Sequence, residues 1–152
     1  RIDFAKALLV EFEKYPGLIK FYKPSFSVAK HLKEQGKLPE PLFDSCPGCK
    51  TEWAFDLSGR IFSCTATVGK EGEAVGSYYP VVKKNDQIIG EWSARDILSI
   101  PECGDCAVRL ACGGGCAAVA KNARGRINAP DCRPVKELLE LGIPFYFKDD
   151  AT

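Results

Sequence analysis

Methionine is absent from this 152-residue sequence, histidine occurs once, and the formal net charge is only +1. A protein that neutralises many phosphates needs a surplus of lysine and arginine, so this balance argues against a nucleic-acid partner. No run approaches the roughly 20 apolar residues that a membrane-spanning helix requires. The first residues also lack the pattern of a secretory signal. We therefore expect a cytoplasmic protein without a membrane partner, and the missing initiator methionine leads us to expect a fragment of a larger protein.

What the sequence does contain is a composition typical of a folded domain, with 45% hydrophobic and 27% charged residues. Helical periodicity or propensity marks five segments, residues 3–14, 27–35, 94–100, 117–123 and 134–142. Gly36 and Gly142 are expected to end the second and the last of these helices. A domain boundary is expected near residue 40, where prolines mark a connector.

Two β-hairpins are expected in the middle of the chain. Residues 52–64 carry alternating apolar side chains before the turn-forming pair Ser58-Gly59, and the apolar pattern resumes after it. Residues 78–92 are predicted to form the second hairpin, with its turn at Asn85-Asp86. Together these elements predict a small α+β fold with short hairpins and flanking helices, which something other than a large sheet must hold together.

The unusual feature is a set of eight cysteines, three of which precede a long gap while five follow it. They are Cys46, Cys49 and Cys64 upstream, and Cys103, Cys106, Cys112, Cys116 and Cys132 downstream. A C-x2-C pair, which occurs once in each group, directs two thiolates at one point and suits a metal or a cluster. Disulfides are the alternative because the number is even, but the lack of a secretory signal disfavours them.

Counting the ligands restricts the topology. Two sites of four cysteines each require one downstream cysteine to complete the upstream site. The competing choice of His31 as the fourth ligand would leave a fifth downstream cysteine unused, so we reject it. Zinc and a [4Fe–4S] cluster both accept four cysteines. Interleaved ligands, which two-cluster ferredoxins also use, favour iron–sulfur, and a zinc-binding structural or interaction module without redox function is the alternative.

Three glycines, Gly113 to Gly115, separate Cys112 from Cys116. Without side chains, the backbone can adopt φ > 0 and pass close to an inorganic core. Its N–H groups can then donate hydrogen bonds to anionic sulfur. This segment therefore fits a cluster better than it fits a merely flexible loop.

Aromatic and basic residues surround the cysteines in the sequence. We expect six aromatic side chains to wrap the upstream site, namely Trp53, Phe55, Phe62, Tyr78, Tyr79 and Trp92. Basic residues flank several cysteines, at Lys50, Arg109, Arg124, Arg126 and Arg133. Each of these either compensates the charge of a cluster or belongs to the solvated surface.

The order and spacing of the cysteines resemble a known domain. Cys49-x9-Gly59-x4-Cys64, the C-x2-C-x5-C-x3-C run from Cys103 to Cys116, and the final Cys132 resemble the SPASM domain of radical S-adenosylmethionine enzymes. The resemblance covers residues 46–134 and implies two [4Fe–4S] clusters. It assigns Cys46, Cys49, Cys64 and Cys116 to the first cluster, and Cys103, Cys106, Cys112 and Cys132 to the second. It also implies that residues 1–40 are the C-terminal end of a partial TIM barrel with a bridging segment, and that residues 41–152 are the SPASM domain.

The resemblance also limits what the chain can do. The catalytic C-x3-C-x2-C motif of this superfamily is absent, because Cys112-x3-Cys116 is followed by Ala-Ala-Val. S-adenosylmethionine is therefore expected only in a missing N-terminal part, and no catalytic residue is assigned here. The implied role is electron transfer or substrate positioning in a maturase, with the N-terminal radical barrel of the same parent chain and a peptide or protein substrate as partners. Sulfatase maturases carry a catalytic aspartate where this sequence has Thr65, so no base is assigned either.

Overall fold

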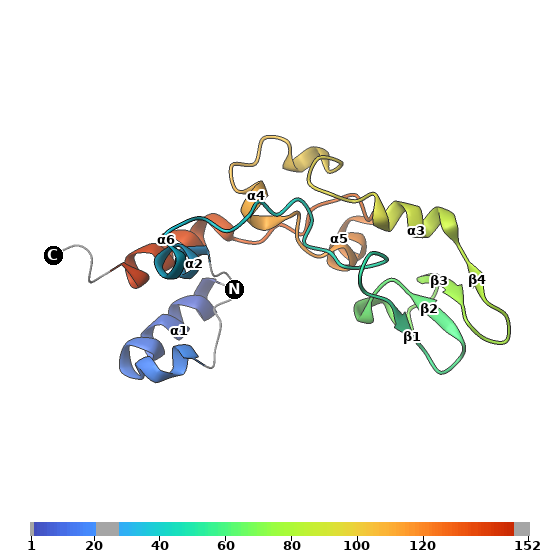
Figure 1. The fold of residues 1–152 in the computed structure, drawn as a ribbon, viewed down its shortest axis with the longest axis horizontal. Helices are drawn as coiled ribbons and strands as arrows, with labels where there is room; N and C mark the ends of the chain where they lie inside the picture. Colours follow the sequence, from blue (N-terminus) through green and yellow to red (C-terminus); the bar gives the residue numbers. More distant parts are fainter. Residues whose placement is uncertain (1, 21–27, 148–152) are drawn as a thin grey trace. The chain divides into compact units, whose positions relative to one another are not determined.

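The computed structural model of the protein describes residues 2–20 and 28–147. The chain divides into two units, one formed by residues 1–41 and 133–152 and the other by residues 42–132 (Figure 1). All eight cysteines belong to the second unit. Among the described helices, none combines the length and the apolar character that a membrane span needs.

The first unit consists of helices. These are α1 (Ile2–Lys14), the 3-10 helix η1 (Pro16–Lys20), α2 (Val28–Gln35) and α6 (Val135–Tyr146). Helix α6 packs against both α1 and α2, and the ring centroids of Phe12 and Phe145 lie 6.3 Å apart. Gly36, with φ +65°, follows α2 and ends it, as the sequence predicts. Ser27, the first residue of the predicted helix, lies outside the described residues.

The C-terminal helix differs from its prediction. The sequence predicts an end at Gly142, which is wrong, because α6 continues to Tyr146. A Cβ atom at position 142 would lie 3.2 Å from the Cβ of Ala29, so this glycine permits a close approach of α6 to α2. Residues 133–152, which the prediction joins to residues 41–132, group with the helical unit in the structure.

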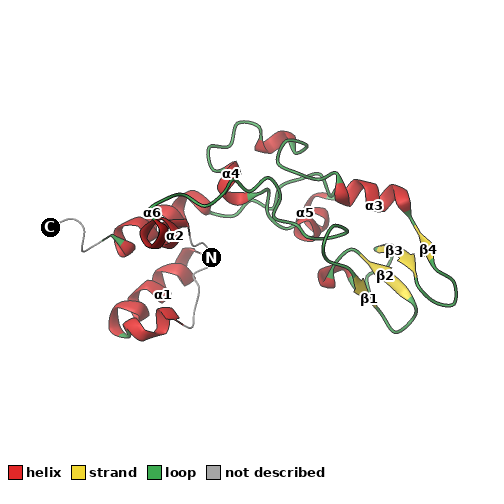
Figure 2. Ribbon diagram, viewed as in Figure 1, coloured by secondary structure: helices red, strands yellow, loops and turns green. Residues whose placement is uncertain are grey.

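The second unit contains a four-stranded antiparallel sheet with the order β1-β2-β3-β4 (Figure 2). The strands are β1 (Ala54–Phe55), β2 (Arg60–Phe62), β3 (Ala74–Ser77) and β4 (Lys83–Lys84). Strand β1 pairs with β2, with Phe55 opposite Ile61, which confirms the first predicted hairpin. Asp56 holds its turn, because the carboxylate accepts hydrogen bonds from the backbone N–H groups of Ser58 and Arg60, both at 3.0 Å.

The position predicted for the turn of the second hairpin is wrong. Strand β3 pairs with β4, with Gly76 opposite Lys84, so residues 78–82 form the connection. Asn85 instead begins helix α3 (Asp86–Ser93), and its side chain accepts a hydrogen bond from the N–H of Ile88 at 3.1 Å. Asparagine is common both at helix N-caps and in turns. Here it caps α3, and this helix places Trp92 in the core.

Short helices and loops make up the rest of the second unit. The remaining helices are η2 (Thr65–Thr67), η3 (Pro101–Cys103), α4 (Arg109–Cys112) and α5 (Ala117–Arg124). Helix α5 confirms the prediction for residues 117–123. Residues 94–100 do not form the predicted helix. There the carboxylate of Asp96 accepts hydrogen bonds from the N–H groups of Leu98 and Ser99, at 2.9 and 2.7 Å, and this local turn competes with a helix.

The core of the second unit comprises two groups of buried residues. The larger contains Cys46, Cys49, Ile61, Cys64, Val75, Trp92, Ala117, Ala118 and Ile127, and the smaller contains Ile97, Ile100 and Cys103. Of the six aromatic residues expected around the upstream site, Phe62 and Trp92 are buried. The prediction is wrong for Trp53, Phe55, Tyr78 and Tyr79, which are 37–70% exposed. Side chains alternate along a strand, so Ala54 is buried while Phe55 lies on the outer face and pairs edge-to-face with Tyr78.

Candidate metal centres

A tight turn presents the first two upstream cysteines. The N–H groups of Lys50, Thr51 and Glu52 all donate to the carbonyl of Pro47, at 2.9–3.0 Å. Cys49 has φ +57°, a left-handed conformation that costs a residue with a side chain about 1–2 kcal/mol. Strained backbone conformations are frequent at functional sites. In this conformation the Cys49 side chain belongs to the buried core.

Three upstream thiols lie close together in this core. Cys46, Cys49 and Cys64 are each at most 9% exposed. Burial raises the pKa of Cys49 to about 11, and the neighbouring thiols of Cys46 and Cys64 add to the rise. Cys116, from the downstream run, packs against the same buried group. The structure thus brings the four residues of the first predicted cluster into one region.

The other four cysteines form a second group. Burial raises the pKa of the Cys103 thiol, and the neighbouring thiols of Cys106, Cys112 and Cys132 raise it further. The Arg95 guanidinium opposes this rise. Cys103 is buried, whereas Cys106 and Cys132 are exposed, so the second group reaches the surface of its unit while the first is largely enclosed.

Gly113, Gly114 and Gly115 connect the two groups, and they have φ values of +63°, +76° and +70°. A Cβ atom at position 115 would lie 2.3 Å from the carbonyl oxygen of Asp131, and one at position 113 would lie 2.7 Å from Leu42. Close approach and left-handed backbone together therefore explain why this segment carries no side chains.

The backbone carbonyls of this glycine segment accept hydrogen bonds, whereas two of its N–H groups donate none among the described residues. The single hydroxyl proton of Ser45 is shared between the carbonyls of Gly113 and Gly115, which lie 3.0 and 2.9 Å from its Oγ. The carbonyl of Gly114 accepts from Arg95 at 2.8 Å. Within the described residues, the buried N–H groups of Gly114 and Gly115 donate no hydrogen bond. Buried N–H groups normally have a partner, so these two are suited to an anion such as a thiolate or a sulfide.

Each group contains four thiols, which is the number of ligands that a [4Fe–4S] cluster takes. All eight cysteines carry free thiols. In the described part of the chain, no three His, Cys, Asp or Glu side chains are arranged to hold a single metal ion.

Two acidic residues and one arginine support the cysteines. Asp44 accepts a hydrogen bond from the N–H of Cys46 at 3.0 Å, and Asp131 accepts one from the N–H of Cys116 at 3.2 Å. Arg95 is 1% exposed and donates to the carboxylate of Asp44 and to the carbonyl of Gly114, which lies between Cys112 and Cys116 in the sequence. The sequence analysis does not identify Arg95 and Asp44, because neither belongs to a motif.

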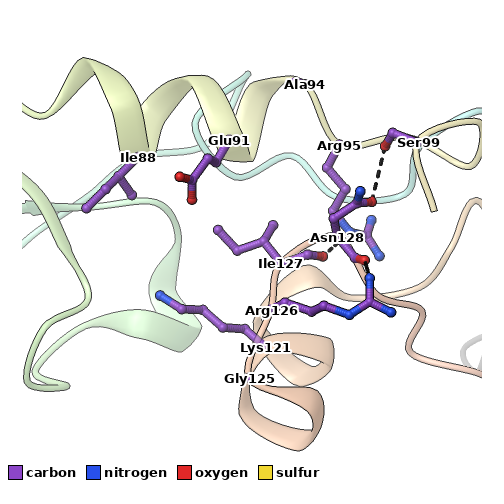
Figure 3. Close-up of a pocket in the computed structure, with 10 residues that line it drawn as sticks. All are labelled: Ile88, Glu91, Ala94, Arg95, Ser99, Lys121, Gly125, Arg126, Ile127 and Asn128. Atoms are coloured by element: carbon purple, nitrogen blue, oxygen red, sulfur yellow. Dashed lines mark hydrogen bonds between the residues drawn. The ribbon is translucent and has the colours of Figure 1, made fainter. Parts of the chain in front are cut away.

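A cavity of about 470 Å³ adjoins this arginine, between α3 and the C-terminal end of α5 (Figure 3). Ile88 and Ile127 give it an apolar lining, and Glu91 and Lys121 give it charge. Lys121 also pairs with Glu73 at 2.7 Å. No cysteine lines the cavity, so it is separate from both thiol groups.

No model of a known protein family matches the chain, and no curated protein matches it. The resemblance to the SPASM domain therefore depends on the cysteine spacing alone and stays a prediction. The arrangement of the eight thiols is the feature from which a function has to be inferred.

Proposed function

We propose that this chain is an auxiliary iron–sulfur domain of a radical S-adenosylmethionine enzyme, and that it holds two [4Fe–4S] clusters. One observation carries the proposal: Cys116, four residues after Cys112, packs against the buried group that contains Cys46, Cys49 and Cys64. The ligand count requires one such crossover, and the spacing resemblance assigns it to the same residue. We name the two sites centre I (Cys46, Cys49, Cys64 and Cys116) and centre II (Cys103, Cys106, Cys112 and Cys132).

The chemistry that the clusters supply when bound is one-electron transfer. Four cysteines at each centre leave no iron site for a substrate, which favours electron transfer over direct binding of substrate to iron. Cys106 and Cys132 lie at the surface, so centre II is suited to exchange electrons with a partner, while centre I is shielded from water by Trp92 and its neighbours. The radical barrel of the parent enzyme would contribute S-adenosylmethionine, and a peptide or protein would be the substrate.

Anaerobic reconstitution tests this proposal. The chain should bind about eight iron and about eight sulfide ions and give a brown protein that dithionite bleaches reversibly. A colourless protein that keeps about two zinc ions would instead support the zinc-binding structural module.

Matched cysteine variants test the ligand assignment. Cys116→Ser should disturb centre I, so that anaerobic alkylation followed by mass spectrometry labels Cys46, Cys49 and Cys64. Cys112→Ser, only four residues away, should instead release the ligands of centre II. If Cys116→Ser releases Cys103 and Cys106 and protects the upstream cysteines, the interleaved arrangement is wrong.

A further inference from the structure

Arg95 is a buried charge with an unusually complete set of partners. Its Nε donates to the carbonyl of Ile127 at 3.0 Å, and its Nη2 donates to the carbonyls of Gly114 and Ala129, at 2.8 and 3.1 Å. Its Nη1 donates to the carboxylate of Asp44 at 3.1 Å. A buried guanidinium is tolerated only when its donors find partners, and four of the five N–H groups of Arg95 donate to segments distant in sequence.

These bonds join the backbone around both centres. Asp44 also accepts the N–H of Cys46, a ligand of centre I. Gly114 lies between Cys112 of centre II and Cys116 of centre I, and Ala129 lies three residues before Cys132. The Arg95 side chain therefore holds the backbone next to one ligand of each centre, and it also holds the glycine segment that connects the two centres.

The surrounding charges do not cancel. The Nζ of Lys50 pairs with Asp44 and also donates to the carbonyl of Arg95 at 2.7 Å. Arg95 and Lys50 thus share the single carboxylate of Asp44, which leaves one surplus positive charge in this network. The guanidinium also lies beside the backbone that leads to centre II, because it donates to the carbonyl of Gly114, two residues after Cys112. A Cβ atom at Gly114 would lie 3.0 Å from Ile100, which belongs to the same buried group as Cys103.

A positive charge near centre II has a defined effect on electron uptake. With four thiolates, a [4Fe–4S]²⁺ cluster has a net charge of about −2, and the addition of one electron brings it to about −3. A fixed positive charge stabilises the more negative state more strongly, so it raises the reduction potential.

We propose that Arg95 is a positioning residue that holds the glycine segment between the two centres and raises the reduction potential of centre II. The effect on the reduction potential rests on the proposed function, whereas the positioning of the glycine segment applies to the protein with or without clusters. The two effects separate in two variants, because Arg95→Lys keeps the charge and loses the bond geometry, while Arg95→Gln loses the charge and keeps part of the hydrogen bonding.

The first experiment compares both variants with Lys83→Gln, which removes an exposed positive charge on β4, outside the cysteine-containing segments of the sequence. Dithionite titration of the reconstituted full chain, followed by electron paramagnetic resonance, gives the potential of each centre. We expect Arg95→Gln to lower the reduced-to-oxidised ratio of centre II at fixed potential by on the order of tenfold, equivalent to about 59 mV. Arg95→Lys and Lys83→Gln should stay within about twofold of the parent protein. Equal potentials in all four proteins would refute the electrostatic role.

The second experiment needs no metal. Hydrogen exchange in the chelator-treated chain should speed up at the N–H groups of Cys46 and Asp131 in both Arg95 variants, by about tenfold or more, and not in Lys83→Gln. The N–H of Asp131 donates to Gly114 at 3.0 Å and so reports directly on the glycine segment. Unchanged exchange in Arg95→Lys would overturn the positioning role. If the parent chain binds no iron, the proposed function fails, while this exchange measurement still decides whether Arg95 holds the segment.

Discussion

Replacement of Gly115 by alanine gives the sharpest test of the glycine segment. Alanine at φ +70° costs about 1–2 kcal/mol for the left-handed backbone alone. Its Cβ would also lie 2.3 Å from the carbonyl oxygen of Asp131, a contact that forces the backbone to move. Overpacking of this kind typically adds about 1–3 kcal/mol. Because Asp131 also accepts the N–H of Cys116, the displacement should reach a ligand of centre I.

Gly125 provides a matched control. Its φ of +73° is nearly the same, but a Cβ atom there would meet nothing within 4 Å. Gly125→Ala should therefore pay only the backbone cost, and the difference between the two variants isolates the steric term. For a chain of this size, a difference of about 1–3 kcal/mol corresponds to a melting temperature about 2–12 °C lower for Gly115→Ala.

Tryptophan fluorescence in a thermal scan measures this difference, because both tryptophans, Trp53 and Trp92, belong to the cysteine-containing unit. Anaerobic reconstitution should also give Gly115→Ala less iron than Gly125→Ala. Equal melting temperatures and equal iron contents in the two variants would refute the reasoning, since they would mean that the close approach to Asp131 does not exist.

Three further results are expected. Trp92→Ala should destabilise the protein by about 3–5 kcal/mol, because Trp92 is 2% exposed and packs against the turn at Gly48. Chemical denaturation followed by circular dichroism measures this loss, and no loss of stability would mean that this core is not packed. Desolvation raises the pKa of Asp56, but hydrogen bonds from Ser58 and Arg60 outweigh it and lower this pKa from 3.8 to about 2. The first hairpin should therefore lose stability as the pH falls from about 4 to about 2. Amide resonances of the turn should report this change, and Asp56→Asn should abolish the pH dependence. Burial raises the pKa of Cys49 from 9.0 to about 11, so the metal-free protein should lose stability as the pH rises through this interval, and Cys49→Ala should show a shallower decline in melting temperature.

Local patterns predicted the parts of the fold that depend on neighbours in sequence. The helix at residues 117–123 and the hairpin at residues 52–64 follow from helix propensity and from alternation about a turn, and both are present. Asn85 was misread because the same residue type caps helices and forms turns. Gly142 was misread because its role depends on Ala29, a residue more than a hundred positions away.

The same distinction applies to the candidate site. The resemblance in cysteine spacing predicts which four cysteines make up each centre, and this assignment stays a prediction. Arg95 could not be found in this way, because its partners lie 19 to 51 residues from it. Its importance comes only from a fold that brings these segments together. The four exposed aromatic residues were misassigned for the opposite reason, since composition indicates a wrapping role whereas strand alternation directs Phe55 outward.

The connection between Cys112 and Cys116 constrains the two centres whatever the rest of the chain does. Four peptide units span at most about 14 Å, and the left-handed conformation of the three glycines shortens this reach. Two clusters bound as proposed therefore have ligand backbones that are close neighbours, and Ser45 and Arg95 fix the carbonyls between them. A displacement at one centre must pass through this short, restrained segment to the other. Interleaved ligation as proposed would thus couple the assembly of the two centres, which two independent four-cysteine sites on separate loops would not do.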